Sequence, residues 1–172
     1  WENITSGHAK MKLLLENWRE YIAEAQVKFQ GILKVVPDSD VITQAKDMQA
    51  QILEQEPLMA PLPETKLHVT LIHQSVLKPF RKIMKNMEFP QPPNISLNPE
   101  IKMAVQGDGS TAVKSYFVEV NEQEELKNYV NEVMTILGAD PNPEPNRVFH
   151  ISLVNKTGSP SDSVAYTWEY AV

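Results

Sequence analysis

The sequence predicts an α+β protein in which two similar halves face each other across a central cleft. In some segments apolar residues recur at helical spacing, and in others they alternate as in a half-buried strand. The same order of strand, helix, proline-rich loop and strand also occurs twice. We therefore expect a bilobal fold with pseudo-twofold symmetry, in which two antiparallel sheets are flanked by helices.

A helix precedes the first half, which begins with a strand. Residues 11–25 carry apolar side chains at helical spacing and predict a short amphipathic helix. Residues 1–10 precede a methionine, and we interpret them as a remnant of an expression vector. Residues 11–172 then form a single domain. The apolar run 29–36 is rich in β-branched residues and ends before a proline, which predicts a strand.

A helix and a second strand complete this half. Asp38 is a good N-cap for a helix that runs to about residue 56. Prolines then form a stiff loop. Residues 66–74 alternate as a strand, with apolar side chains on one face and His68 and Thr70 on the other.

The second half repeats this order after a connecting segment. Two proline clusters and a glycine-rich turn separate its elements. Pro99 places the first strand of this half at an edge or a bulge. The predicted elements are a helix at 76–86, strands at 95–106 and 113–120, a helix at 122–137, and strands at 147–156 and 164–172.

Composition and charge exclude several classes of function. The chain has 172 residues, no cysteine and a net charge of −6, from 16 Lys and Arg against 22 Asp and Glu. Thiolate metal sites, cysteine nucleophiles and disulfide scaffolds are therefore excluded. An acidic chain does not favour long duplex nucleic acid. No segment predicts a membrane span or a signal peptide, so we expect a cytoplasmic protein and leave its oligomeric state open.

Two tetrapeptides occupy matching places in the two halves. Residues 68–71 read His-Val-Thr-Leu, and residues 150–153 read His-Ile-Ser-Leu. On a strand, side chains two residues apart share a face, so each histidine points the same way as its hydroxyl partner. The two motifs therefore predict a cleft with two imidazoles and two hydroxyls. The alternative is two structural histidines on half-buried strands.

This pattern resembles the 2H phosphoesterases, a family with paired His-x-Thr/Ser-x motifs on two symmetric lobes. Both motifs are intact and stand 82 residues apart (150 − 68). The resemblance implies cleavage of phosphodiesters without a metal or another cofactor. It also implies a small nucleotide or an RNA end as substrate: a 2′,3′-cyclic phosphate, a 2′,5′-linked oligonucleotide or a cyclic oligonucleotide. The arginine that RNA-ligase-like members often carry after the second motif is absent.

The residues themselves allow the same chemistry. Cleavage of a phosphodiester needs a base, an acid and donors to the phosphoryl oxygens. With an ordinary pKa near 6.5, one of two facing histidines can be neutral and the other protonated at neutral pH. We expect His68 and His150 to be base and acid in either order, and Thr70 and Ser152 to donate to the phosphate. His73 has the opposite strand parity, which disfavours a metal site.

Three further residues are candidates for binding the substrate. Lys156 shares the parity of His150 and could meet a phosphate, although most lysines in such a position are solvated surface residues. Phe117 could stack on a base or pack in the core. Trp168 belongs to an alternating aromatic strand that could pack on a lobe or cap the cleft. A binding module without turnover, and a partner protein that uses the helix at 11–25, are the alternatives to an enzyme.

Overall fold

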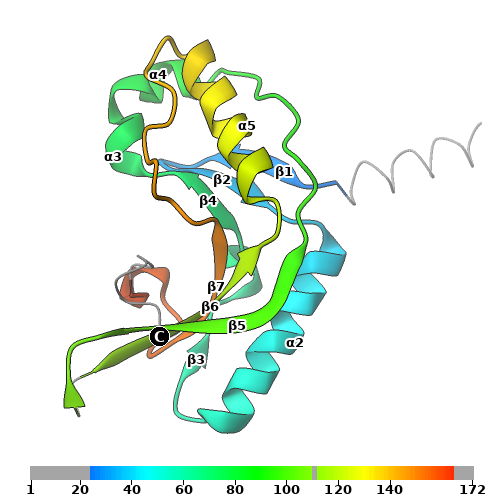
Figure 1. Ribbon diagram of the computed structural model, residues 1–172, viewed down its shortest axis with the longest axis vertical. Helices are drawn as coiled ribbons and strands as arrows, with labels where there is room; N and C mark the ends of the chain where they lie inside the picture. The colour runs from blue at the N-terminus through cyan, green and yellow to red at the C-terminus, as the bar shows by residue number, and fades with distance from the viewer. Residues whose placement is uncertain (1–23, 110–111, 165–172) are drawn as a thin grey trace, which may run out of the picture.

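The computed structural model describes residues 24–109 and 112–164, which form an α+β fold around one seven-stranded antiparallel sheet (Figure 1). The strand order is β1-β2-β4-β7-β6-β5, and the short strand β3 also pairs with β7. The elements are β1 (Gln26–Phe29), β2 (Leu33–Val36), α2 (Ser39–Gln55), β3 (Ala60–Pro61), η1 (Glu64–Lys66), β4 (Val69–Ile72), α3 (Gln74–Leu77), η2 (Lys78–Phe80), α4 (Arg81–Met84), β5 (Leu97–Gln106), β6 (Val113–Val120), α5 (Gln123–Ile136), β7 (His150–Asn155) and η4 (Pro160–Asp162).

The two halves use the same order of elements. The first consists of β1, β2, α2 and β4, and the second of β5, β6, α5 and β7. In the sheet, both halves run from their hairpin at the edge to their last strand at the centre. There β4 pairs with β7 through Val69 and Ile151, which are the second residues of the two motifs. Equivalent residues therefore face each other at the middle of the sheet, as a twofold relation requires.

An irregularity in strand pairing repeats in both halves. Between β2 and β4 the register shifts after Leu33, so that Lys34 pairs with Thr70. Between β6 and β7 the register shifts after Tyr116, and the next residue pairs with Ser152 in the same way. The internal repeat predicted from the sequence thus extends to the details of strand pairing.

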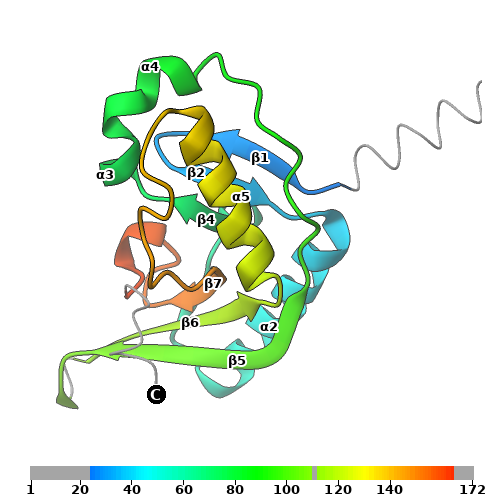
Figure 2. The ribbon, with the colours of Figure 1, turned by 45° about the horizontal axis from the view of Figure 1, so that its top comes forward.

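The two long helices pack into one hydrophobic core. Asp38 caps α2, because its carboxylate accepts hydrogen bonds from the backbone amides of Asp40 and Val41. Helix α2 contacts β7, and α5 contacts β4, so each helix packs on the central strand of the other half (Figure 2). Ile151 and Leu153 of β7 are buried in this core. The side chain between them along β7 therefore faces away from the core.

Three expectations need correction. The halves share one sheet instead of two, because β4 and β7 pair at the centre. The segment 29–36 is not one strand: it contains the last residue of β1, a turn and β2, which form a hairpin. Gly31 lies in the turn and has a φ of 84°. The helix predicted at 76–86 is divided into α3, η2 and α4, because a proline follows Lys78 and interrupts regular helix.

Other expectations agree with the structure or lie outside it. Strand β5 is at the sheet edge, and its register shifts around the proline at position 99. The helix predicted at 122–137 is α5, and Gly138, with a φ of 68°, follows it in the conformation typical of a C-terminal cap. Nearly all of the helix expected at 11–25 and of the strand expected at 164–172 lies outside the described residues. Within the described part of the chain, no helix combines the length and apolarity needed to span a bilayer.

Candidate active site

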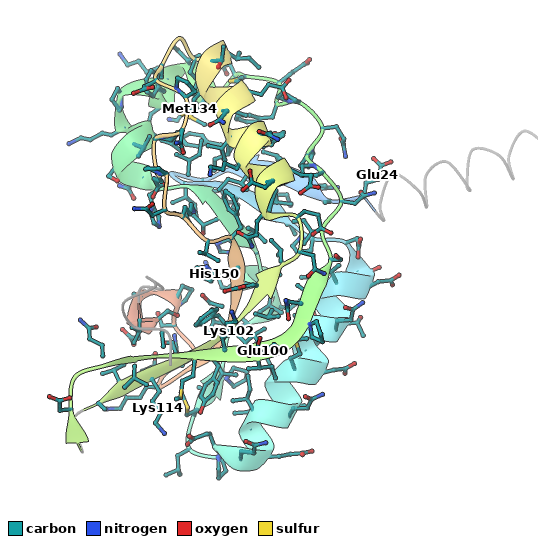
Figure 3. All side chains as sticks on the ribbon, viewed as in Figure 1. Glu24, Glu100, Lys102, Lys114, Met134 and His150 are labelled. Carbon is teal, nitrogen blue, oxygen red and sulfur yellow. The ribbon has the colours of Figure 1, made fainter. Side chains whose placement is uncertain are left out.

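A cleft of about 820 Å³ opens on the face of the sheet that the helices leave uncovered. Its wall contains both histidines and both hydroxyl residues of the two motifs: His68, Thr70, His150 and Ser152. Figure 3 shows His150 near the middle of the molecule, where β7 lies between the strands of the two halves. The motifs therefore contribute to one site, although they are far apart along the chain.

The pairing of β4 with β7 explains how the four side chains meet. Val69 pairs with Ile151, and both point into the core. One residue to either side, the register places His68 opposite Ser152 and Thr70 opposite His150, all on the cleft face. The two histidines are then diagonal neighbours, about 7–8 Å apart in a regular antiparallel pair, with their Cβ atoms somewhat closer.

His150 is held by a hydrogen bond and by an aromatic ring. Its Nδ1 donates to the carbonyl oxygen of Val148 at 2.9 Å. In the neutral ring this leaves the lone pair on Nε2. The ring of Phe117 packs edge-on against the imidazole, with centroids 5.4 Å apart. Burial lowers the pKa of His150 to about 4, with a smaller effect of Arg147, while the Val148 carbonyl and Glu119 oppose this lowering.

His68 has less support from its surroundings. Its Nδ1 is buried and finds no hydrogen-bond partner at bonding distance among the described residues. Burial lowers the pKa of His68 to about 4, and the charges of Lys34 and Lys66 add to this effect. The backbone of Lys66 partly offsets it. In the free protein the sequence-based expectation of one neutral and one protonated imidazole at neutral pH is therefore not met, because both rings are neutral.

An anion in the cleft would change these protonation states. A negative charge a few ångströms from an imidazole favours the imidazolium and raises its pKa. It would also compensate the charges of Lys34, Lys66 and Arg147, which oppose protonation in the free cleft. An anion bound in this cleft would therefore favour protonation of the two histidines.

Two lysines in the cleft lie on the side of His68. Lys34 pairs across the strands with Thr70 and therefore shares its face. It is 93% buried, and its Nζ donates to Oε1 of Gln30 at 2.8 Å. Burial and the neighbouring charge of Lys66 lower the pKa of Lys34. Its ammonium group thus has a neutral amide as its hydrogen-bond partner.

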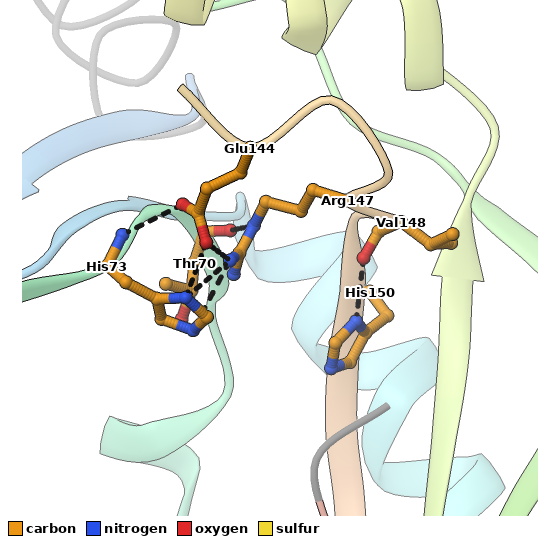
Figure 4. A network of polar contacts seen from close by, with 6 residues as sticks. All are labelled: Thr70, His73, Glu144, Arg147, Val148 and His150. Atoms are coloured by element: carbon orange, nitrogen blue, oxygen red, sulfur yellow. Dashed lines mark hydrogen bonds and ion pairs between the residues drawn. The ribbon is translucent and has the colours of Figure 1, made fainter. Parts of the chain in front are cut away.

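A second polar cluster borders the cleft where the two halves meet (Figure 4). The Nε of Arg147 donates to the carbonyl oxygen of Thr70 at 3.0 Å, and its NH1 group contacts Glu144 at 3.1 Å. Glu144 also accepts from His73, at 2.6 Å from Nδ1 and 3.2 Å from the backbone amide. Hydrogen bonding to His73 and the charge of Arg147 lower the pKa of Glu144, against the effect of its burial. Arg147 thereby ties the loop before β7 to β4.

The expectation that His73 faces away from the site is wrong. His73 lines the same cleft as His68. Strand β4 ends at Ile72, so His73 already belongs to the turn into α3, where strand parity no longer applies. Among residues 24–109 and 112–164, no group of three or more His, Asp or Glu side chains is placed to hold a metal ion.

Of the three predicted binding residues, Lys156 and Phe117 lie outside the cleft wall, and Trp168 lies outside the described residues. Lys156 is exposed and follows the end of β7, where Asn155 accepts hydrogen bonds from the next backbone amides and turns the chain. Strand parity therefore does not extend to Lys156. Phe117 is on the cleft side but only 3% exposed, so it supports His150 and offers no face for stacking on a base.

Sequence reasoning missed Lys34, Arg147 and Glu144. Lys34 interrupts an apolar strand, which is itself a signal. It also stands 34 residues before His68 (68 − 34), close to the 33 residues between Phe117 and His150 (150 − 117), so the repeat pairs Lys34 with Phe117. Nothing in the sequence distinguishes Arg147 and Glu144, because their roles depend on how a loop folds over β4.

Comparisons with known proteins add no relative. No protein-family model matches the chain, and no significant match to a curated protein or to a solved structure was found.

Proposed function

We propose that this chain is a metal-independent phosphodiesterase of the 2H phosphoesterase type, which hydrolyses or opens a small nucleotide phosphodiester. One observation carries the proposal: the pairing of Val69 with Ile151 gathers an imidazole and a hydroxyl from each half in one cleft. Three cationic side chains in the same wall, Lys34, Lys66 and Arg147, give the cleft of an acidic protein the charge that a phosphate requires.

The groups present can complete a hydrolysis. One neutral histidine takes a proton from water, whose oxygen attacks phosphorus and forms the new P–O bond. The P–O bond to the leaving ribose oxygen breaks, and the other histidine, protonated in the presence of the anion, gives its proton to that oxygen. Thr70 and Ser152 donate hydrogen bonds to the non-bridging oxygens. One water is consumed, and the two histidines exchange their protonation states.

The wall of the cleft is compatible with either order of acid and base. In its neutral form His150 presents Nε2 as an acceptor, because Nδ1 is engaged with Val148. His68 lies beside two lysines, which favour its neutral form. A substrate whose leaving group approaches His150 would use His68 as the base, and the reverse orientation would exchange the roles.

A panel of phosphodiesters tests the proposal. It contains 2′,3′-cyclic mononucleotides, 2′,5′-linked oligoadenylate and cyclic dinucleotides, with products identified by mass spectrometry. We expect turnover of at least one class, insensitivity to EDTA, and loss of at least about 10²-fold in kcat for His68→Ala and for His150→Ala. Circular dichroism of both variants controls for folding. Retained turnover in either folded variant, or tight binding without any product, would refute the mechanism.

A further inference from the structure

The cleft is symmetric in its reactive groups but not in its charges. The repeat relates Lys34, which pairs with Thr70, to Phe117, which pairs with Ser152. One side of the site therefore carries a buried ammonium group, and the corresponding place on the other side carries an aromatic ring. The positive charge of Lys34 therefore has no counterpart at the equivalent place in the other half.

The charges on the two sides are also compensated differently. On the side of Phe117, Lys102 forms an ion pair with Glu119 at 3.0 Å. At the meeting of the two halves, Arg147 contacts Glu144 at 3.1 Å. The Nζ of Lys34 donates to the amide oxygen of Gln30, which carries no charge, and its neighbouring charges are those of Lys66 and Lys28. Two positive charges thus lie together beside His68 and repel each other until an anion binds.

The position of Lys34 separates it from the reacting phosphate. It stands one strand further out than Thr70, about 4.8 Å away in the direction across the sheet. Its Nζ is held by Gln30, which belongs to the turn between β1 and β2, away from the central strands. The ammonium group therefore extends the site outward from the four motif residues. A cleft of about 820 Å³ lies near the upper end of the usual range for small-molecule sites and has room for a ligand with two anionic groups.

We infer that Lys34 and Lys66 form a second phosphate subsite, so that the preferred substrates are nucleotides with another phosphate besides the one that reacts. This inference rests on the proposed function and deepens it. It favours 5′-phosphorylated ends and linked or cyclic oligonucleotides over an unphosphorylated 2′,3′-cyclic mononucleoside phosphate. Lys34 binds the second phosphate by a charge-assisted hydrogen bond, and Lys66 adds its charge from the exposed helix η1.

Two probes that do not react separate this subsite from the catalytic centre. Adenosine 3′,5′-bisphosphate and adenosine 3′-monophosphate differ by one phosphate, and isothermal titration calorimetry measures the affinity of both. We expect the wild type to bind the bisphosphate at least about tenfold more tightly, as one charge-assisted hydrogen bond would give. In Lys34→Met this preference should fall below about threefold.

Two further variants complete the experiment. Lys66→Met changes an exposed position and should reduce the preference in part, which tests the subsite even where Lys34→Met fails to fold. Lys156→Met removes the same charge outside the cleft and should keep the full preference. Equal affinity of the wild type for both probes would overturn the inference. So would an equal loss of affinity for both probes in Lys34→Met, which would place Lys34 on the single shared phosphate.

The two proposals fail in different ways. A preference for the bisphosphate that depends on Lys34, in a protein that turns over no phosphodiester of the panel, would refute the enzyme and keep the subsite. Turnover of the panel by a wild type that binds both probes equally would keep the enzyme and refute the subsite.

Discussion

The stability of the protein should depend on pH through its two cleft histidines. The pKa of His68 and that of His150 are each lowered from 6.5 to about 4 on folding. The folded protein thus binds these protons more weakly than the unfolded chain does. Each neutral histidine contributes its full stability above pH 6.5, and this contribution is lost as the pH falls through about 4.

The magnitude follows from the size of the shift. A shift from 6.5 to about 4 is worth at most about 3–4 kcal/mol for each histidine, since one pKa unit is about 1.4 kcal/mol. Between pH 7 and pH 5 the contribution of one histidine to the free energy of unfolding should fall by about 2 kcal/mol. These are upper values, because both rings also face a cleft that is open to water.

Urea unfolding at several pH values between 7 and 5 measures the effect. His150→Gln removes the titrating ring and keeps an amide that can donate to the Val148 carbonyl, so its free energy of unfolding should fall less steeply with acid than that of the wild type. Ser152→Ala changes a neighbouring cleft residue that does not titrate, and its slope should match that of the wild type. Parallel curves for His150→Gln and the wild type would refute the reasoning about burial.

Three other expectations concern the cleft and its frame. Binding of adenosine 3′-monophosphate at pH 7 should take up protons, because the anion raises the pKa of a neutral cleft histidine. Calorimetry in buffers of different ionisation enthalpy measures this proton uptake, and its absence would contradict the mechanism. Arg147→Met should cost about 1–3 kcal/mol in urea unfolding, since the Thr70 carbonyl loses a donor and the half-buried carboxylate of Glu144 keeps only His73; an unchanged midpoint would show that this link contributes nothing. Gly158→Ala should cost at least about 1 kcal/mol and lower the Tm, because the new Cβ would lie 2.8 Å from the Pro61 carbonyl oxygen at a φ of 76°; an unchanged Tm would contradict this.

Much of the fold could be predicted because local patterns match long-range structure. The apolar spacing in α5 and the capping residue Asp38 before α2 are local sequence signals, and both agree with the way these helices pack. The hairpin of β1 and β2 was missed because its turn is only three residues long, between two apolar strands, and Gly31 alone marks it. The joining of two predicted sheets into one could not be predicted, since it depends on a short pairing between distant strands.

The candidate site, too, could be predicted only in part from the sequence. Strand parity predicted that His68 and His150 share a face with their hydroxyl partners, and the structure brings all four into one cleft wall. Parity failed at His73 and at Lys156, because each stands just beyond the last residue of a strand, where the chain turns. Parity still held for His68, which stands one residue before β4, so periodicity ends where the chain turns and not at the strand boundary itself.

The pairing of Val69 with Ile151 has a consequence for how such a molecule could arise. A central pair in which each residue faces its own counterpart is the contact that two identical half-length chains would make in a homodimer. In one polypeptide that contains both halves the geometry is the same, but a substitution in one half no longer has to occur in the other. A single substitution then alters one half without its counterpart, as Lys34 beside Thr70 and Phe117 beside Ser152 illustrate.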